Sequence, residues 1–157
     1  MSATRSLLAA ALLTGLAGCS PRRIPGTEIP DTADTRAIVG LLDRYRQAVE
    51  RRDPAAVLAL VSGGYFDDAG TPDPADDLDR TTLEKVLPQD LGRLASVRFD
   101  VRVNDVRVDG DRAEAFLRFD ARYRITTRGG EVPKAQTDVS RVVLVREKAG
   151  WRIASGL

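Results

Sequence analysis

Histidine does not occur in this 157-residue sequence. Its absence removes the side chain that most often acts as a general base near neutral pH and the most frequent ligand of transition metals. An excess of one charge is also lacking, because 24 basic and 23 acidic residues leave a net charge of +1. Binding to nucleic acid needs a basic excess, so a nucleic-acid partner is not expected. Nucleotide-binding, nucleophile-elbow and zinc motifs are missing as well, and we expect no cofactor and no metal.

Cysteine is present once, as Cys19, so we expect the fold to use no disulfide. Upstream of it lie one cation, Arg5, an apolar run over residues 7–13 and then small residues. This order is typical of an export signal, and the apolar run is too short for a membrane-spanning helix. The segment from Leu16 to Cys19, with the sequence LAGC, resembles the lipobox of bacterial lipoproteins.

The lipobox resemblance implies that the chain is cut before Cys19, that the thiol carries a diacylglyceryl group and that the new amine is acylated. Two or three acyl chains anchor a protein stably, so the lipid bilayer is an expected partner through acylated Cys19. The residue after the cysteine is Ser20 and not an aspartate. In lipoproteins of two-membrane bacteria, this resemblance implies that the protein is sorted to the outer membrane. In an organism with one membrane, it implies a position on the outer face of the cell membrane. An ordinary secretory signal that contains a cysteine is the alternative.

Three segments follow from this interpretation. Residues 1–18 are a lipoprotein signal peptide, and residues 19–33 are the lipidated N-terminus with a flexible tether. The tether carries three prolines, one glycine and no periodicity. Residues 34–157 form one folded domain.

Helices are predicted in the first part of this domain. Apolar residues three and four positions apart, from Ile38 to Val49, predict a helix over residues 35–52. Asp53 and Pro54 predict the cap and first turn of a second helix that reaches about residue 61. Thr81 with Glu84 resembles a capping box and predicts a third helix to about residue 95, which Pro88 breaks or kinks.

An aspartate-rich loop is predicted between the second and third helices, over residues 67–79. Carboxylates on a loop suit a calcium ion, but their spacing does not match the EF-hand pattern. We expect this loop to be a solvated acidic segment.

From residue 96 the hydrophobic period changes to two, which predicts a four-stranded antiparallel meander. The apolar run Val142-Val143-Leu144-Val145 predicts a central strand that is buried on both sides. Helices that precede strands predict an α+β fold, with three N-terminal helices packed on one face of a strongly curved antiparallel sheet of about four strands.

Two local signatures carry a family resemblance. The segment from Leu42 to Leu58 contains a long helix, an aspartate break and a second helix, and the segment from Val142 to Ile153 contains a Gly-Trp turn before the last strand. Together with the order of elements, they resemble the nuclear transport factor 2-like (NTF2-like) superfamily, which includes SnoaL-type cyclases and ketosteroid isomerases. The resemblance implies a cone-like fold over residues 34–157. It leaves the activity open, because this superfamily contains enzymes, binding proteins and assembly modules.

Strand alternation predicts which side chains face the helices. Val97 to Val103 on one strand and Ala113 to Ile125 on the next face inward, and Tyr123 is the only polar group among them. The charged residues between them face outward, where cross-strand ion pairs explain them. The aspartate base that ketosteroid isomerases use therefore has no counterpart inside the cone, and we assign no catalytic residue. The candidate lining of a ligand cavity is Tyr45, Tyr65, Leu117, Phe119, Tyr123 and Trp151.

The sequence therefore predicts a lipid-anchored protein of the cell envelope that acts as a non-enzymatic binding or protein-interaction module. The charged open face of the sheet is the predicted contact for a second copy or for another envelope protein. The alternative is a small-molecule isomerase, cyclase or hydratase of the SnoaL or ketosteroid isomerase type. A buried ionisable side chain at the base of the cone would favour that alternative.

Overall fold

A computed structural model describes residues 22–157 of the chain. The predicted signal peptide and Cys19 lie outside the described residues. Within them, no helix is both long enough and apolar enough to cross a membrane. The elements in chain order are α1 (Ala33–Glu50), α2 (Pro54–Leu58), β1 (Phe66–Asp67), β2 (Leu78–Asp79), α3 (Arg80–Gly92), β3 (Leu94–Asp109), β4 (Arg112–Thr127), β5 (Gly130–Glu147) and β6 (Gly150–Ser155).

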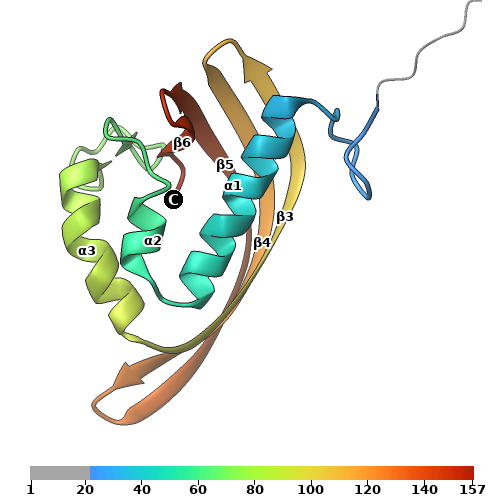
Figure 1. The fold of residues 1–157 in the computed structure, drawn as a ribbon. Coiled ribbons are helices and arrows are strands. Elements are labelled where there is room, and N and C mark those ends of the chain that lie inside the picture. The colour runs from blue at the N-terminus through green and yellow to red at the C-terminus, as the bar shows by residue number, and fades with distance from the viewer. Residues whose placement is uncertain (1–21) are drawn as a thin grey trace, which may run out of the picture.

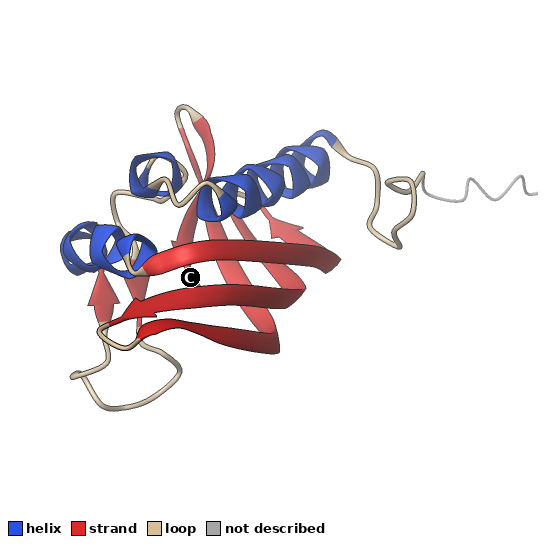
Figure 2. Ribbon diagram, turned by 90° about the horizontal axis from the view of Figure 1, so that it is seen from below, coloured by secondary structure: helices blue, strands red, loops and turns tan. Residues whose placement is uncertain are grey.

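The architecture is the predicted α+β fold. Strands β3 to β6 form an antiparallel meander in the order β3-β4-β5-β6, and β1 pairs with β2 in a separate two-stranded sheet. The long strands curve around the helices (Figure 1), and the helices cover one side of the four-stranded sheet (Figure 2). The prediction of helices on one face of an antiparallel sheet is therefore confirmed.

Helix α1 begins at Ala33, two residues before the predicted start, because Thr32 and Thr35 form a capping box. Its apolar face, which includes Ile38, Leu41 and Leu42, is buried against the sheet. The periodicity therefore predicted the buried face of this helix correctly, and the capping box explains why the helix begins earlier than predicted.

Helix α2 has the predicted cap: the Asp53 carboxylate accepts from the Ala56 amide at 3.0 Å. It ends at Leu58, earlier than predicted, because the chain then joins the sheet. Val61 forms a parallel bridge with Ile153, and the Ser62 amide donates to the Ile153 carbonyl oxygen at 2.7 Å.

The capping box predicted at Thr81 and Glu84 is wrong. Asp79 caps α3 instead, and its carboxylate accepts from the Thr82 amide at 2.7 Å. Glu84 pairs with Arg80 at 2.8 Å. Pro88 lies inside this helix and does not end it.

Inward alternation of apolar residues holds along β3 and β4. A register shift between Val103 and Asp105 changes the parity of β3, so that Val106 becomes buried. The apolar run of β5 is central as predicted, with Val142, Val143 and Leu144 buried. The first part of β5, residues 130–139, is exposed throughout.

The flexible tether predicted for residues 19–33 is not found over its described part. The Ile24 amide donates to the Ile29 carbonyl oxygen at 2.9 Å, and the Asp31 amide donates to the Arg22 carbonyl oxygen at 2.6 Å. Ile29 is buried in the main hydrophobic core. Its apolar side chain closes this segment onto the domain, so the folded part begins near residue 22 and not at residue 34.

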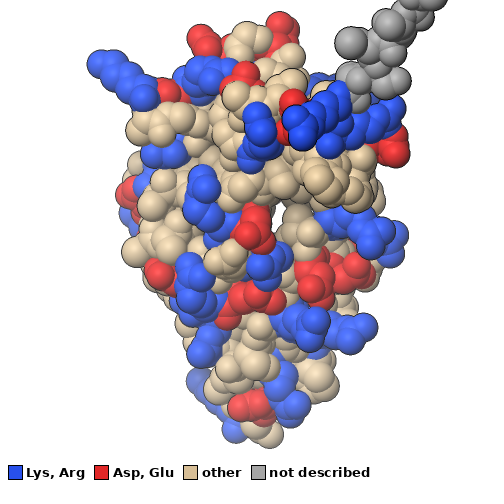
Figure 3. Space-filling model, turned by 45° about the vertical axis from the view of Figure 1, so that its right-hand side comes forward, with Lys and Arg blue, Asp and Glu red and all other residues tan. Residues whose placement is uncertain are grey.

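The outward face of β3 and β4 also differs from expectation, because residues of like charge lie directly opposite one another. The register pairs Arg98 with Arg122 and Asp100 with Asp120. Ion pairs run along the strands instead, as between Arg98 and Asp100 at 3.2 Å. The predicted cross-strand ion pairs are therefore wrong for these positions. On the side seen in Figure 3, acidic and basic side chains are interspersed and no large area carries one sign.

Candidate functional site

The concave face of the sheet and the helix α1 that packs on it enclose an apolar cleft of about 330 Å³. Helix α1 contributes Tyr45 and Val49, and β3 and β4 contribute a row of inward-facing apolar side chains that includes Leu117. Alanine at position 121 leaves space at the wall of the cleft where a larger side chain would fill it. Ala113 and Ala115, the other small inward-facing residues of β4, are instead packed in the main core.

Three aromatic rings form one wall of this cleft. Tyr45 meets Phe99 edge-on, with ring centroids 5.9 Å apart and an interplanar angle of 83°. Phe99 in turn lies 5.7 Å from Phe119 at 53°. Edge-on and tilted pairs of this kind are favourable contacts, so the wall is fixed by packing before any ligand enters.

Four of the six predicted lining residues meet at the cleft: Tyr45, Leu117, Phe119 and Tyr123. They come from α1 and β4. Ligand binding by these residues stays a prediction, since the geometry brings the side chains together without showing an occupant.

Tyr65 does not line the cleft. It is buried, and its hydroxyl lies 3.3 Å from a carboxylate oxygen of Asp67 and accepts from the Leu157 amide at 3.4 Å. Burial and the nearby Asp67 carboxylate raise the pKa of Tyr65. Its role in this fold is to hold the segment that follows β6.

Trp151 also lies away from the cleft, at the start of α1. Its indole N–H donates to the Asp34 carboxylate at 3.2 Å, and the Arg146 guanidinium stacks 4.4 Å from its ring. Arg146 also pairs with Asp34 at 2.8 Å and lowers the pKa of that carboxyl group. These contacts join α1 to β5 and β6, which is a structural role.

Several cleft residues escaped sequence reasoning. Gln136 and Ser140 on β5 line the cleft, as do Gly156 and Leu157 after β6. The β5 residues had a usable signal, since alternation inward from Val142 places Ser140 and Gln136 on the same face.

The segment after β6 had no such signal. Gly156 turns it with a φ of +92°, and its amide donates to the Asp67 carboxylate at 2.6 Å. A Cβ at Gly156 would overlap the Arg141 carbonyl oxygen. Asp67 belongs to the loop predicted to be a solvated acidic segment, and for this residue the prediction is wrong.

Among the described residues that line the cleft, none is aspartate, glutamate, lysine or arginine, and the polar side chains are those of Tyr45, Tyr123, Gln136 and Ser140. Burial raises the pKa of the Tyr45 phenol to about 12, so this group remains a hydrogen-bond donor. Nor do the described residues contain a group of histidine, cysteine or acidic side chains that could hold a metal ion. An apolar lining with a few hydroxyl and amide side chains suits the binding of a largely apolar molecule.

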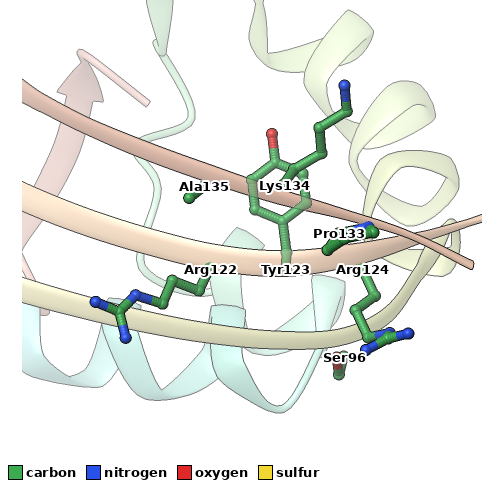
Figure 4. A pocket seen from close by; sticks show the side chains of 7 residues that line it. All are labelled: Ser96, Arg122, Tyr123, Arg124, Pro133, Lys134 and Ala135. Atoms are coloured by element: carbon green, nitrogen blue, oxygen red, sulfur yellow. The ribbon is translucent and has the colours of Figure 1, made fainter.

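A second hollow, of about 420 Å³, lies near the β4–β5 turn and has three cations around it, Arg122, Arg124 and Lys134. Figure 4 shows Tyr123 and Lys134 on one side of the sheet and the two arginines on the other. Arg124 is also paired with Glu131 at 2.8 Å. Because the cations do not converge on one point, this hollow is not a built anion site.

The fold is shared with solved structures of the NTF2-like class. A protein from Kribbella flavida superposes with a TM-score of 0.67 at 18% identity, over 78% of this chain and 87% of that chain. A putative dehydratase of the NTF2-like family from Streptomyces avermitilis gives 0.61 at 19% identity, over 78% and 93%. A ketosteroid isomerase-like protein from Erwinia carotovora atroseptica gives 0.62 at 18%, over 80% and 95%. No protein-family model and no curated protein matches the sequence. These likenesses establish an NTF2-like fold.

Proposed function

We propose that this protein is a lipid-anchored component of the cell envelope that binds a small, largely apolar molecule in its concave cleft and does not convert it chemically. The cleft itself carries the proposal, because apolar side chains line most of it, its polar side chains are hydroxyls and one amide, and burial raises the pKa of the Tyr45 phenol to about 12. Pockets of this kind take apolar ligands and use a few polar groups for orientation.

The position in the envelope rests on the segment from Leu16 to Cys19 and its resemblance to a lipobox. Only Ser20 and Pro21 separate Cys19 from Arg22, where the described residues begin. The three Cα–Cα steps from Cys19 to Arg22 span about 10 Å at most. An acylated Cys19 would therefore hold the domain close to the bilayer, where an apolar molecule could reach the cleft.

Binding can be tested with a variant that fills the cleft. Ala121 is nearly buried and lines it, so Ala121→Phe is expected to occupy the space that a ligand would use. Ala75→Phe is the matched control, since Ala75 is exposed in the loop between β1 and β2. The full chain, purified from its host envelope in detergent, is analysed by native mass spectrometry with added N-phenyl-1-naphthylamine, a neutral apolar probe.

We expect the unsubstituted chain and the Ala75→Phe variant to retain the probe or a host molecule. We expect Ala121→Phe to lose at least about tenfold in affinity, as overfilling of a packed site predicts. Equal retention by both variants would mean that binding occurs elsewhere.

An enzyme of the dehydratase or isomerase type is the second candidate. It is favoured by the solved structures of this fold that carry those descriptions and by the Tyr45 phenol, which could donate to a carbonyl oxygen. Recovery of the retained host molecule after incubation separates the two candidates. An unchanged molecule supports binding, and a converted one whose formation falls in Tyr45→Phe supports catalysis.

A further inference from the structure

Strand β5 has an unpaired edge that β6 does not cover. Strand β6 pairs only with residues 143–147 of β5, and the preceding part of β5 is exposed on both faces over residues 130–139. The turn between β4 and β5 lies beyond the ends of the helices, at the lower left of Figure 1. An edge of this length can pair with a further strand.

At the other edge of the sheet, formed by β3, side chains bond to the outward-facing backbone groups. On β3, the Glu50 carboxylate accepts from the Phe99 amide at 3.1 Å, and the Arg52 guanidinium donates to the Leu94 carbonyl oxygen at 2.6 Å. These side chains satisfy backbone groups that would otherwise face outward. Such protection is what a strand edge needs when it has no partner.

The backbone groups that face outward on β5 belong to the odd-numbered residues. Hydrogen bonds alternate in an antiparallel pair, so every second residue of β5 directs its N–H and C=O away from β4. Pro133 has no N–H and still lies in the ladder opposite Arg124, and the Val139 amide donates to the Asp138 carboxylate at 2.8 Å. Both residues therefore belong to the outward-facing set.

The charges of this edge are complementary to themselves about Gln136. When the strand is placed antiparallel to its own copy with Gln136 opposite Gln136, Glu131 faces Arg141 and Lys134 faces Asp138. These four residues are all the charged residues between positions 131 and 141. Opposite charges directly across an antiparallel pair are favourable.

Other registers lose this complementarity. Centring the pairing on residue 135 or 137 places each charge opposite a neutral residue or outside the pairing. Centring it on residue 134 or 138 places Lys134 or Asp138 opposite the same residue of the second copy, which is unfavourable. The strand therefore specifies a single register for pairing with itself.

We propose that the free edge of β5 pairs antiparallel with the same edge of a second copy of this chain, about a two-fold axis at Gln136. Within one copy, Glu131 already pairs with Arg124 and Arg141 with Glu114, while Lys134 and Asp138 form no ion pair with any of the described residues. Pairing of the two copies gives Lys134 and Asp138 a partner of opposite charge and joins the two meanders into one sheet.

This dimer also bears on the cleft. Gln136 lines the cleft and faces the helix side of the sheet. A two-fold axis perpendicular to the sheet keeps both concave faces on the same side. The Gln136 side chains of the two copies then lie next to each other at the margins of two clefts that open in one direction.

Cysteine cross-linking tests the register in the full chain. At the axis, Gln136 forms a non-hydrogen-bonded pair with its copy, with Cα atoms about 4.5 Å apart, which lies within disulfide range. Gln136→Cys should therefore form a covalent dimer under mild oxidation. In the control Val139→Cys, the two introduced thiols are about 20 Å apart and should not react. The unsubstituted chain, with Cys19 alone, supplies the background.

A charge exchange tests the same pairing without a cross-link, through the dimer Kd measured by sedimentation equilibrium. Asp138→Lys places two lysines opposite each other at both ends of the pairing and should raise the Kd about tenfold. The double variant Lys134→Glu/Asp138→Lys should restore it. The proposal is overturned by a monomeric unsubstituted chain, by equal cross-linking at positions 136 and 139, or by a dimer that the single exchange leaves unchanged. The last result would favour contact through the charged face of the sheet.

Discussion

Tyr45 connects the packing of the fold with the chemistry of the cleft. Its ring packs against Phe99, and its hydroxyl lies in an apolar environment that raises its pKa to about 12. An unfolded tyrosine ionises near pH 10, so between pH 10 and 12 the unfolded state loses a proton that the folded state keeps. The free energy of unfolding should then fall as the pH rises through this window, by up to about 2 kcal/mol from Tyr45.

Tyr45→Phe should reduce this slope while leaving stability below pH 10 nearly unchanged. Burial also raises the pKa of Tyr65, so in that variant Tyr65 still contributes to the fall of the unfolding free energy with pH. Urea unfolding at a series of pH values measures both. An identical slope in the variant and the unsubstituted chain would contradict the placement of the phenol in an apolar environment.

Two of the predicted site residues were misplaced for a reason that sequence patterns do not contain. The partner of Trp151 is Asp34, and the hydroxyl of Tyr65 meets Leu157. Both contacts join positions that are far apart in the chain. Aromatic residue type indicates burial at a polar margin, but it does not say whether that margin is a cleft or a junction between elements.

At the scale of elements, local patterns predicted which helices and strands exist, and which of their residues face inward, better than they predicted where each element begins and ends. Alternation placed the inward residues of β3 and β4 correctly, since a sheet with one buried face fixes its register strongly. The cap of α3 was misjudged because Asp79 and Thr81 both suit an N-cap, and only tertiary packing chooses between them. The free edge of β5 was not predicted, because the order of the strands does not say how far β6 extends along its neighbour.

Pro88 gives an element-scale prediction. It lies exposed inside α3, where it cannot donate to the Glu84 carbonyl oxygen. The side-chain amide of Gln89 donates to the neighbouring Lys85 carbonyl oxygen at 3.3 Å. Pro88→Ala restores the missing donor and a good helix former, so it should stabilise the protein by about 1–3 kcal/mol.

Chemical unfolding in urea measures this gain, with Lys85→Ala as a control on the same helix that should change stability by less than about 0.5 kcal/mol. A destabilised Pro88→Ala variant would show that the proline fits a bend that α3 needs for packing.

At the scale of the whole molecule, the fold class followed from the order of periodicities, and the extent of the domain did not. Residues 22–31 read as a tether because prolines and a glycine suppress any period. Ile29 is buried in the core and Ile24 packs against it, and these contacts dock the segment. Two apolar residues five positions apart match neither a helical nor a strand period, so the pattern did not predict this docking. The contact of the open sheet face with a partner stays a prediction.

The anchor itself is the last prediction. If Cys19 is acylated, the full chain should stay with the membrane fraction in high salt and be released by detergent, since acyl chains are held by the hydrophobic effect and not by charge. Cys19→Ser removes the acylation site and should move the protein to the soluble fraction. Adhesion through Arg22 and Arg23 is the competing cause of membrane association, and it would be lost in high salt in both chains. A Cys19→Ser variant that remained with the membrane in high salt would refute the lipoprotein assignment, and with it the short link that places the cleft beside the bilayer.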